Sequence, residues 1–178
     1  MTRSSHLGFG LILTCLALAG LLGSVFDVAS SIFFIAAGDL QPPVLEVGLL
    51  SNDYVGLAGH PAARTIAIAA LAVGTLGSLL PWFAVAELGW RLCAHPVISP
   101  ATGAAFRHLT WALAAWALFQ AAASALLLLA WNRYEVETSL NINTNGLLPT
   151  IVAIVTAWCI ALLIARAVAV ACENEAFV

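Results

Sequence analysis

Four stretches of the chain are apolar and long enough to cross a membrane. An α-helix rises about 1.5 Å per residue, so about 20 apolar residues cross a hydrocarbon core about 30 Å thick. Each stretch is too long for a strand, and its content of Ala and Leu favours helix. The pattern therefore predicts an all-α, integral membrane four-helix bundle formed by one domain over residues 1–178. The expected helices lie at about residues 7–37, 64–92, 100–132 and 147–172.

The first apolar stretch is compatible with two interpretations. Residues 7–37 contain a single charged residue, Asp27, and are long enough for a retained helix. Arg3 and the small residues Ala17-Leu18-Ala19 also fit a signal peptide with its cleavage site. The apolar run continues well beyond that site, which favours the retained helix. The orientation of the later helices is the same in both cases.

Arginine placement predicts that orientation. All six basic residues are Arg, and the cytoplasmic loops of membrane proteins carry an excess of positive charge. A cytoplasmic N-terminus places four arginines inside, namely Arg3, Arg91, Arg107 and Arg166. It places two outside, Arg64 and Arg133. We therefore expect a multi-pass protein with both termini in the cytoplasm.

The two predicted extracytoplasmic loops differ in length and pattern. The first covers about residues 38–63 and is the longer, rich in Gly, Pro and acidic residues. The second covers residues 134–146, where apolar and polar residues alternate. Such alternation is typical of strands, so a short hairpin or strand pair is predicted there. On the cytoplasmic side, Ser99-Pro100 predicts the N-cap and first residue of the third helix.

Composition supports lipid as the solvent for much of this chain. Hydrophobic residues make up 62% of it and charged residues 8%, and the mean hydropathy is +1.02. A soluble domain carries about 25% charged residues, enough to cover a globular surface. The net charge is −3 and no basic run occurs, so direct nucleic-acid binding is excluded.

Residue types that carry chemistry form no recognisable site in the sequence. No Ser/His/Asp set, Walker loop or H-E-x-x-H motif occurs. The four His residues lie at or beyond the predicted helix ends, where they cannot hold a haem between facing helices. The four Cys form no C-x-x-C pair and are expected to be idle thiols. We therefore expect no enzyme activity, no cofactor and no metal site.

Small residues at helical spacing predict the faces through which the helices pack, because close packing holds membrane helices together. These faces comprise Gly20, Gly23, Ser24, Asp27 and Ser31 in the first helix, Ala70, Gly74, Gly77 and Ser78 in the second, and Ala117, Ala121, Ser124 and Ala125 in the third, with Gln120 close by. Pro81 lies within the second helix and removes one backbone hydrogen bond. It is either a tolerated membrane proline or a hinge.

Asp27 is an ionisable residue within a predicted span. Such a residue costs about 3 kcal/mol or more unless it is paired or hydrated. It lies roughly 30 Å along the first helix, near the outer face, and shares the small-residue face. We expect an ion pair with Arg64 or Arg133, which lie at similar depth. The functional alternative is a carboxylate that binds a proton or a cation.

Glu87, near the inner end of the second helix, has two candidate partners. Arg91 follows it by four residues, the favourable order for an ion pair within a helix. Arg166 in the fourth helix reaches about the same level and would pin the cytoplasmic ends of two helices together. The sequence leaves both pairings open.

Two short stretches resemble a known family. Residues His95–Pro100, followed by Phe106-Arg107-His108-Leu109, are similar to the inner loop of DUF2975, a bacterial family of small four-helix membrane proteins of unknown function. Residues 164–178 resemble the ending of that family. The resemblance covers the second half and, in the first half, only the layout; Val97-Ile98 stand where the family has Phe. It implies four helices, an inner-membrane location and a regulatory partner, but no established activity.

These observations predict a non-enzymatic interaction protein with a regulatory, accessory or protective role in a bacterial inner membrane. The bilayer is its expected environment. A protein partner would contact the cytoplasmic face through Phe106, Arg107, Glu173 and Glu175. The alternative is a small oligomeric transporter or channel that uses Asp27. A homo-oligomer is compatible with either function.

Overall fold

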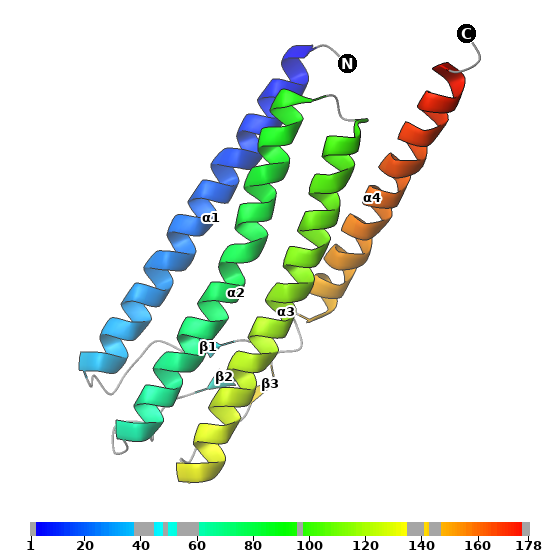
Figure 1. Ribbon diagram of the computed structural model, residues 1–178. Helices are drawn as coiled ribbons and strands as arrows, with labels where there is room; N and C mark the ends of the chain where they lie inside the picture. The colour runs from blue at the N-terminus through cyan, green and yellow to red at the C-terminus, as the bar shows by residue number, and fades with distance from the viewer. Residues whose placement is uncertain are drawn as a thin grey trace. The chain divides into compact units, whose positions relative to one another are not determined.

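Four long helices, packed as a bundle, make up most of the protein. The computed structural model describes residues 3–37, 45–47, 50–52, 61–95, 98–134, 141–142 and 147–175. The helices are α1 (Arg3–Ala37), α2 (Pro61–Ala94), α3 (Pro100–Tyr134) and α4 (Leu147–Glu175) (Figure 1). The all-α four-helix fold predicted from the hydrophobic pattern is therefore confirmed, and the observed helices begin or end up to four residues beyond the predicted limits.

Each helix carries an apolar segment long enough to cross a bilayer. These segments are Leu7–Phe33, Pro61–Ala94, Pro100–Leu129 and Leu148–Cys172. The shortest has 25 residues. At about 1.5 Å per residue it exceeds a hydrocarbon core about 30 Å thick. Large apolar side chains cover the outside of all four helices, as expected where lipid is the solvent. The chain is a multi-pass membrane protein with four candidate spans.

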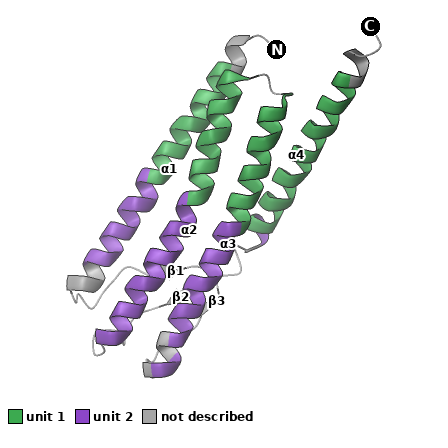
Figure 2. Cartoon of the chain, viewed as in Figure 1, with its two compact units in different colours: residues 1–21, 80–114, 150–178 green, residues 22–79, 115–149 purple. Residues whose placement is uncertain are grey.

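The bundle divides into two compact units, coloured green and purple in Figure 2. Unit 1 comprises residues 1–21, 80–114 and 150–178, and unit 2 comprises residues 22–79 and 115–149. Helix α2 passes from one unit to the other between Leu79 and Leu80, directly before Pro81. It continues as one helix through that proline, as membrane helices often do. The hinge interpretation of Pro81 stays a prediction.

The core of unit 2 lies between α2 and α3. Ala67, Ala70 and Leu71 of α2 pack against Ala123 and Leu127 of α3. Alanine at the contact lets the two backbones approach closely, which is how membrane helices gain packing energy. The small-residue face predicted for α2 is therefore correct. On α3 the contact lies on the Ala123 side, and the predicted Ala121 and Ala125 are exposed.

Unit 2 also holds a small antiparallel sheet. It comprises β1 (Leu45–Val47), β2 (Leu50–Asn52) and β3 (Asn141–Ile142) in the order β1-β2-β3. Val47 pairs with Leu50 in the hairpin, and Leu50 pairs in turn with Ile142. The strand signal in residues 134–146 was correct, and of the predicted hairpin or strand pair the described residues show a strand pair. The described part of the loop supplies one two-residue strand, which pairs with the other loop.

The core of unit 1 joins α1, α2 and α3. Leu88 and Leu92 of α2 pack with Ala105 of α3. The start of α3 is fixed by Ser99, whose hydroxyl oxygen accepts the Thr102 backbone N–H at 3.2 Å. This is an N-cap with Pro100 as the first helical residue, as the sequence predicted.

Candidate functional site

A charged cluster joins α2 and α3 in unit 1. Glu87 Oε1 accepts hydrogen bonds from Arg91 Nε at 2.8 Å and Arg91 Nη2 at 2.6 Å. Glu87 Oε2 lies 3.1 Å from Nδ1 of His108. Of the two pairings that the sequence left open, the structure therefore contains the one with Arg91. It adds His108, which links the carboxylate to the neighbouring helix.

Arg166 does not join this cluster, because α4 meets α3 at a different level. A Cβ added to Gly103 would lie 3.3 Å from Ile164 of α4. Arg166, two residues after Ile164, therefore lies near the first turn of α3. Glu87 lies level with His108, five residues or about 7 Å beyond Gly103 along α3. Arg166 is exposed, and the described residues offer it no ion pair.

Two exposed tryptophans accompany the charged cluster. Trp90 follows Glu87 by three residues and Trp111 follows His108 by three, so each lies on the same side of its helix as the charged residue. Trp90 is 71% exposed and Trp111 is 68% exposed. We call this surface of five residues (Glu87, Trp90, Arg91, His108 and Trp111) the α2–α3 face.

The sequence held one overlooked signal for His108. The connection between α2 and α3 is short, so residues equally distant from its midpoint lie side by side in the two antiparallel helices. Glu87 and His108 are each about ten residues from the middle of that connection, at residues 97 and 98. Because α3 begins at Pro100, His108 lies two turns inside the helix and faces the carboxylate.

A polar cavity lies within unit 2. Its volume is about 200 Å³, and it is lined by Ser24, Asp27 and Val28 of α1, Leu71, Gly74, Thr75 and Ser78 of α2, and Gln120 of α3. Several of its hydrogen-bond donors are already used inside the helices. Thr75 donates to the Leu71 carbonyl at 2.6 Å, and Ser78 donates to the Gly74 carbonyl at 2.9 Å. The Gln120 amide donates to Gly74 O at 3.2 Å and to Ser78 Oγ at 3.3 Å.

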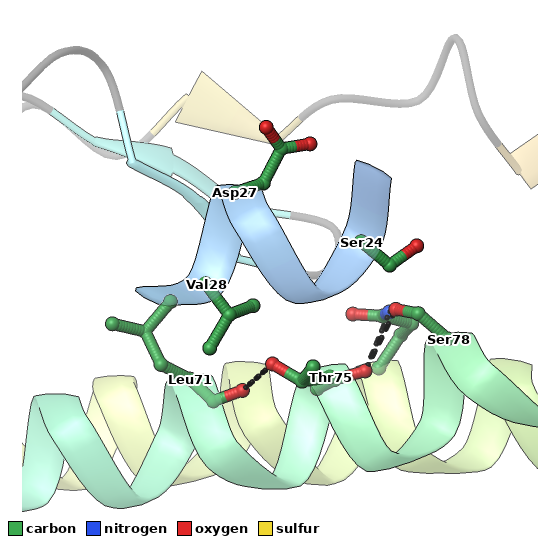
Figure 3. Close-up of a pocket in the computed structure, with 8 residues that line it drawn as sticks. Ser24, Asp27, Val28, Leu71, Thr75 and Ser78 are labelled. Atoms are coloured by element: carbon green, nitrogen blue, oxygen red, sulfur yellow. Dashed lines mark hydrogen bonds between the residues drawn. The ribbon is translucent and has the colours of Figure 1, made fainter. Parts of the chain in front are cut away.

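Asp27 is at the edge of this cavity but does not reach into it. Its side chain is exposed, and Figure 3 shows the carboxylate pointing away from Leu71, Thr75 and Ser78 of α2. The Asp27 backbone carbonyl accepts the hydroxyls of Ser30 and Ser31. Asp27 therefore lies on the cavity side of α1, as the small-residue face predicted, with its carboxylate turned outward.

Asp27 lies at a different level along the helices from its predicted partners, Arg64 and Arg133. Asp27 lies beside Leu71 and Gln120, which line the same cavity. Arg64 precedes Leu71 by seven residues, about 10 Å of helix, and Arg133 follows Gln120 by thirteen residues, about 20 Å. Accordingly, the ion pairs between described residues include neither predicted pair. Helix α1 continues ten residues past Asp27 and ends at Ala37, as the sequence predicted.

Gln120 ties α3 to α2 inside the span. Replacement with leucine keeps the size of the side chain but removes two interhelical hydrogen bonds. Such bonds contribute about 0.6–1.7 kcal/mol within membranes. We expect Gln120→Leu to lower the stability of the purified protein by that amount in detergent unfolding experiments. Ser30→Ala, which removes only a bond within α1, should leave the unfolding midpoint unchanged; equal midpoints for Gln120→Leu and wild type would contradict the contact.

A second cavity, of about 210 Å³, separates the start of α3 from α4 in unit 1. It contains Arg107, one of the predicted partner contacts, whose side chain is exposed. Phe106 is half-buried against the core of unit 1, so packing accounts for its ring. Glu173 and Glu175 belong to the last turns of α4, and their side chains lie outside the described part of the chain.

The described residues contain no group of three His, Cys, Asp or Glu that could hold a metal ion. All four cysteines are free thiols. Comparison with known families, curated proteins and solved structures finds no match to this chain. The resemblance to DUF2975 therefore rests only on the two sequence stretches that carry it.

Proposed function

We propose that the protein is a non-enzymatic interaction protein of a bacterial inner membrane, with a regulatory, accessory or protective role. Its termini would lie in the cytoplasm. Arginine placement supports this orientation, since Arg3, Arg91, Arg107 and Arg166 all belong to unit 1. Arg64 and Arg133 belong to unit 2. The positive-inside rule then assigns the helix ends of unit 1 to the cytoplasmic side.

The α2–α3 face is the observation that carries the proposal. Glu87 and His108 keep 33% and 57% of their side-chain surface exposed although they pair with each other. Exposing a carboxylate to lipid costs free energy, so the α2–α3 face must contact water, lipid headgroups or another protein. Arg and Trp are the residue types that dominate binding energy at protein interfaces. A protein partner covering this face would use both tryptophans and keep the ion pairs intact.

Site-specific crosslinking in native membranes tests this proposal. A photoreactive amino acid at position 111 should capture one stoichiometric protein, identified by mass spectrometry. The same group at position 163, where Leu163 is 65% exposed on α4, is the matched control and should capture mainly lipid. Capture of lipid alone at both positions, or of the same proteins at both, would contradict a partner at the α2–α3 face.

The polar cavity of unit 2 favours a second candidate, a small oligomeric transporter or channel using Asp27. The cavity places hydroxyl and amide groups beside a carboxylate-bearing helix within a predicted span. Two observations argue against transport. The Asp27 carboxylate points away from α2, and several hydrogen-bond donors that line the cavity already bond within the protein. Transport through this site would require the Asp27 side chain to turn inward.

Ion flux separates the two candidates. We expect proteoliposomes with the wild-type protein to show no proton or sodium flux above empty liposomes, and Asp27→Asn to behave identically. Flux that depends on the wild-type protein and falls at least about tenfold in Asp27→Asn would instead assign the protein to transport, since each tenfold step corresponds to about 1.4 kcal/mol. Glu87→Gln, which alters a carboxylate in the other unit, is the matched control.

A further inference from the structure

The cavity between α3 and α4 in unit 1 has one charged side and one apolar side. Arg107 lies one helical turn after Gly103, so both residues face the cavity from α3. Ala161, Ala165 and Val168 recur at intervals of four and three residues and line it from α4. A cationic side chain beside an apolar trough is the combination that an amphiphile with an anionic headgroup would fit.

Small residues keep this cavity open. Gly103 has no side chain, and a Cβ there would already approach Ile164 to 3.3 Å. Ala161 and Ala165 each present a single methyl group on the facing helix. The cavity has a volume of about 210 Å³.

Arg107 is available for an external anion. Its side chain is exposed, and the ion pairs of the described chain leave it without a carboxylate. Glu87, which lies level with His108 next to Arg107 in the chain, is occupied by Arg91 and His108. Arg166 follows the cavity residue Ala165 and adds a second exposed positive charge at the same end of α4. The backbone N–H at the third residue of α3 is already bonded to Ser99, so the arginine side chains are the groups that would bind an anion here.

We infer that this cavity binds an anionic phospholipid, with the phosphate held by Arg107 near the cytoplasmic ends of the helices and an acyl chain running past Ala161 toward the middle of the span. Basic pockets between membrane helices on the cytoplasmic side are the usual form of such sites. A free phosphate would use the charge but leave the apolar trough empty. A lipid would occupy both the charged and the apolar part of the cavity, and lipid is present at high concentration around every span. The site lies outside the α2–α3 face and does not depend on a protein partner.

Lipid binding to the purified full-length protein tests this inference by native mass spectrometry. Phosphatidylglycerol should bind in preference to phosphatidylcholine. Arg107→Gln should weaken phosphatidylglycerol binding about fivefold, the effect of removing about one cationic contact at a membrane surface. Ala165→Leu, which fills the trough without changing charge, should also weaken it. Arg133→Gln removes an exposed arginine in the other unit and should leave binding unchanged.

Four results would overturn the lipid assignment. Equal binding of the two lipids would show that charge is not recognised. Equal weakening by Arg107→Gln and Arg133→Gln would show general electrostatic attraction. Displacement of phosphatidylglycerol by millimolar inorganic phosphate would identify free phosphate as the occupant, and binding of a hexaglutamate peptide without lipid binding would identify an acidic protein. Unfolding midpoints in neutral detergent confirm that each variant is folded before its binding is compared.

Discussion

Replacement of Gly89 with alanine should destabilise the protein by about 1–3 kcal/mol, the usual penalty for overpacking a close contact. Gly89 lies where α2 meets α1 in unit 1. An added Cβ would lie 2.6 Å from Thr14 Oγ1 and 2.8 Å from the Gly10 carbonyl oxygen. Side chains essentially never approach so closely, so the helices would have to separate.

The neighbours of Gly89 have little freedom to move. Thr14 Oγ1 donates to the Gly10 carbonyl at 2.9 Å, which fixes its rotamer. The contact is reciprocal, because a Cβ at Gly10 would lie 2.6 Å from the Gly89 carbonyl oxygen. Separation of α1 from α2 would also loosen the nearby core around Leu88. Alanine gains about 1 kcal/mol of helix propensity over glycine, which offsets part of the loss.

Gly23→Ala is the matched control, because the same substitution there meets no atom within 4 Å. It should leave the protein unchanged or stabilise it by up to about 1 kcal/mol through helix propensity alone. Unfolding in mixed detergent micelles, followed by circular dichroism, measures both variants. If Gly89→Ala were as stable as Gly23→Ala, α1 and α2 could not be in backbone contact at this position.

The spans were predictable because the hydrophobic signal is long and uninterrupted. The run from residue 7 to residue 37 exceeds any strand, and one acidic residue does not break it. The same uninterrupted apolar run gave no indication of how deep Asp27 lies in the span. Depth was counted from the start of the apolar run, although α1, with 35 residues, is longer than a hydrocarbon core about 30 Å thick requires. Only the neighbours Leu71 and Gln120 fix the true level of Asp27.

Pairwise contacts between helices were predictable only where the connection is short. The link between α2 and α3 fixes which residues lie opposite each other, so the Glu87–His108 contact follows from counting. Helix α4 is joined to α3 by a longer segment, and its level is set by the packing of Gly103 against Ile164. Sequence alone gives no such level, which is why it left the pairing of Glu87 with Arg166 open beside the pairing with Arg91.

The strand pairing in the small sheet could not be predicted for a different reason. Alternation in residues 134–146 indicated a strand but not its partner. The partner, β2, comes from the other loop, about 90 residues earlier in the chain. Short strands need neighbours to be stable, and a two-residue strand gains its pairing only from a hairpin that already exists. The long-range pairing therefore depends on the bundle bringing the two loops together.

Alanine at Trp90 or Trp111 should remove most of the affinity for a protein partner on the α2–α3 face. Truncation of an interface tryptophan commonly costs about 2 kcal/mol or more, which corresponds to about 30-fold weaker binding. Both side chains are more than two-thirds exposed, so their loss leaves no cavity in the core of unit 1. Affinity purification from native membranes, with the partner quantified by mass spectrometry, measures the effect.

Trp158→Ala is the matched control, because Trp158 is a 44% exposed tryptophan on α4, away from the proposed face. Tyrosine at position 111 separates binding from a membrane-anchoring role. Tyrosine serves as well as tryptophan in the aromatic belts at membrane interfaces, so a belt residue would tolerate Trp111→Tyr. A partner pocket shaped around an indole would not, and recovery should fall severalfold. Full recovery with both Trp90→Ala and Trp111→Ala would remove the α2–α3 face from the interaction and leave the Glu87–His108 contact as an internal tie between α2 and α3.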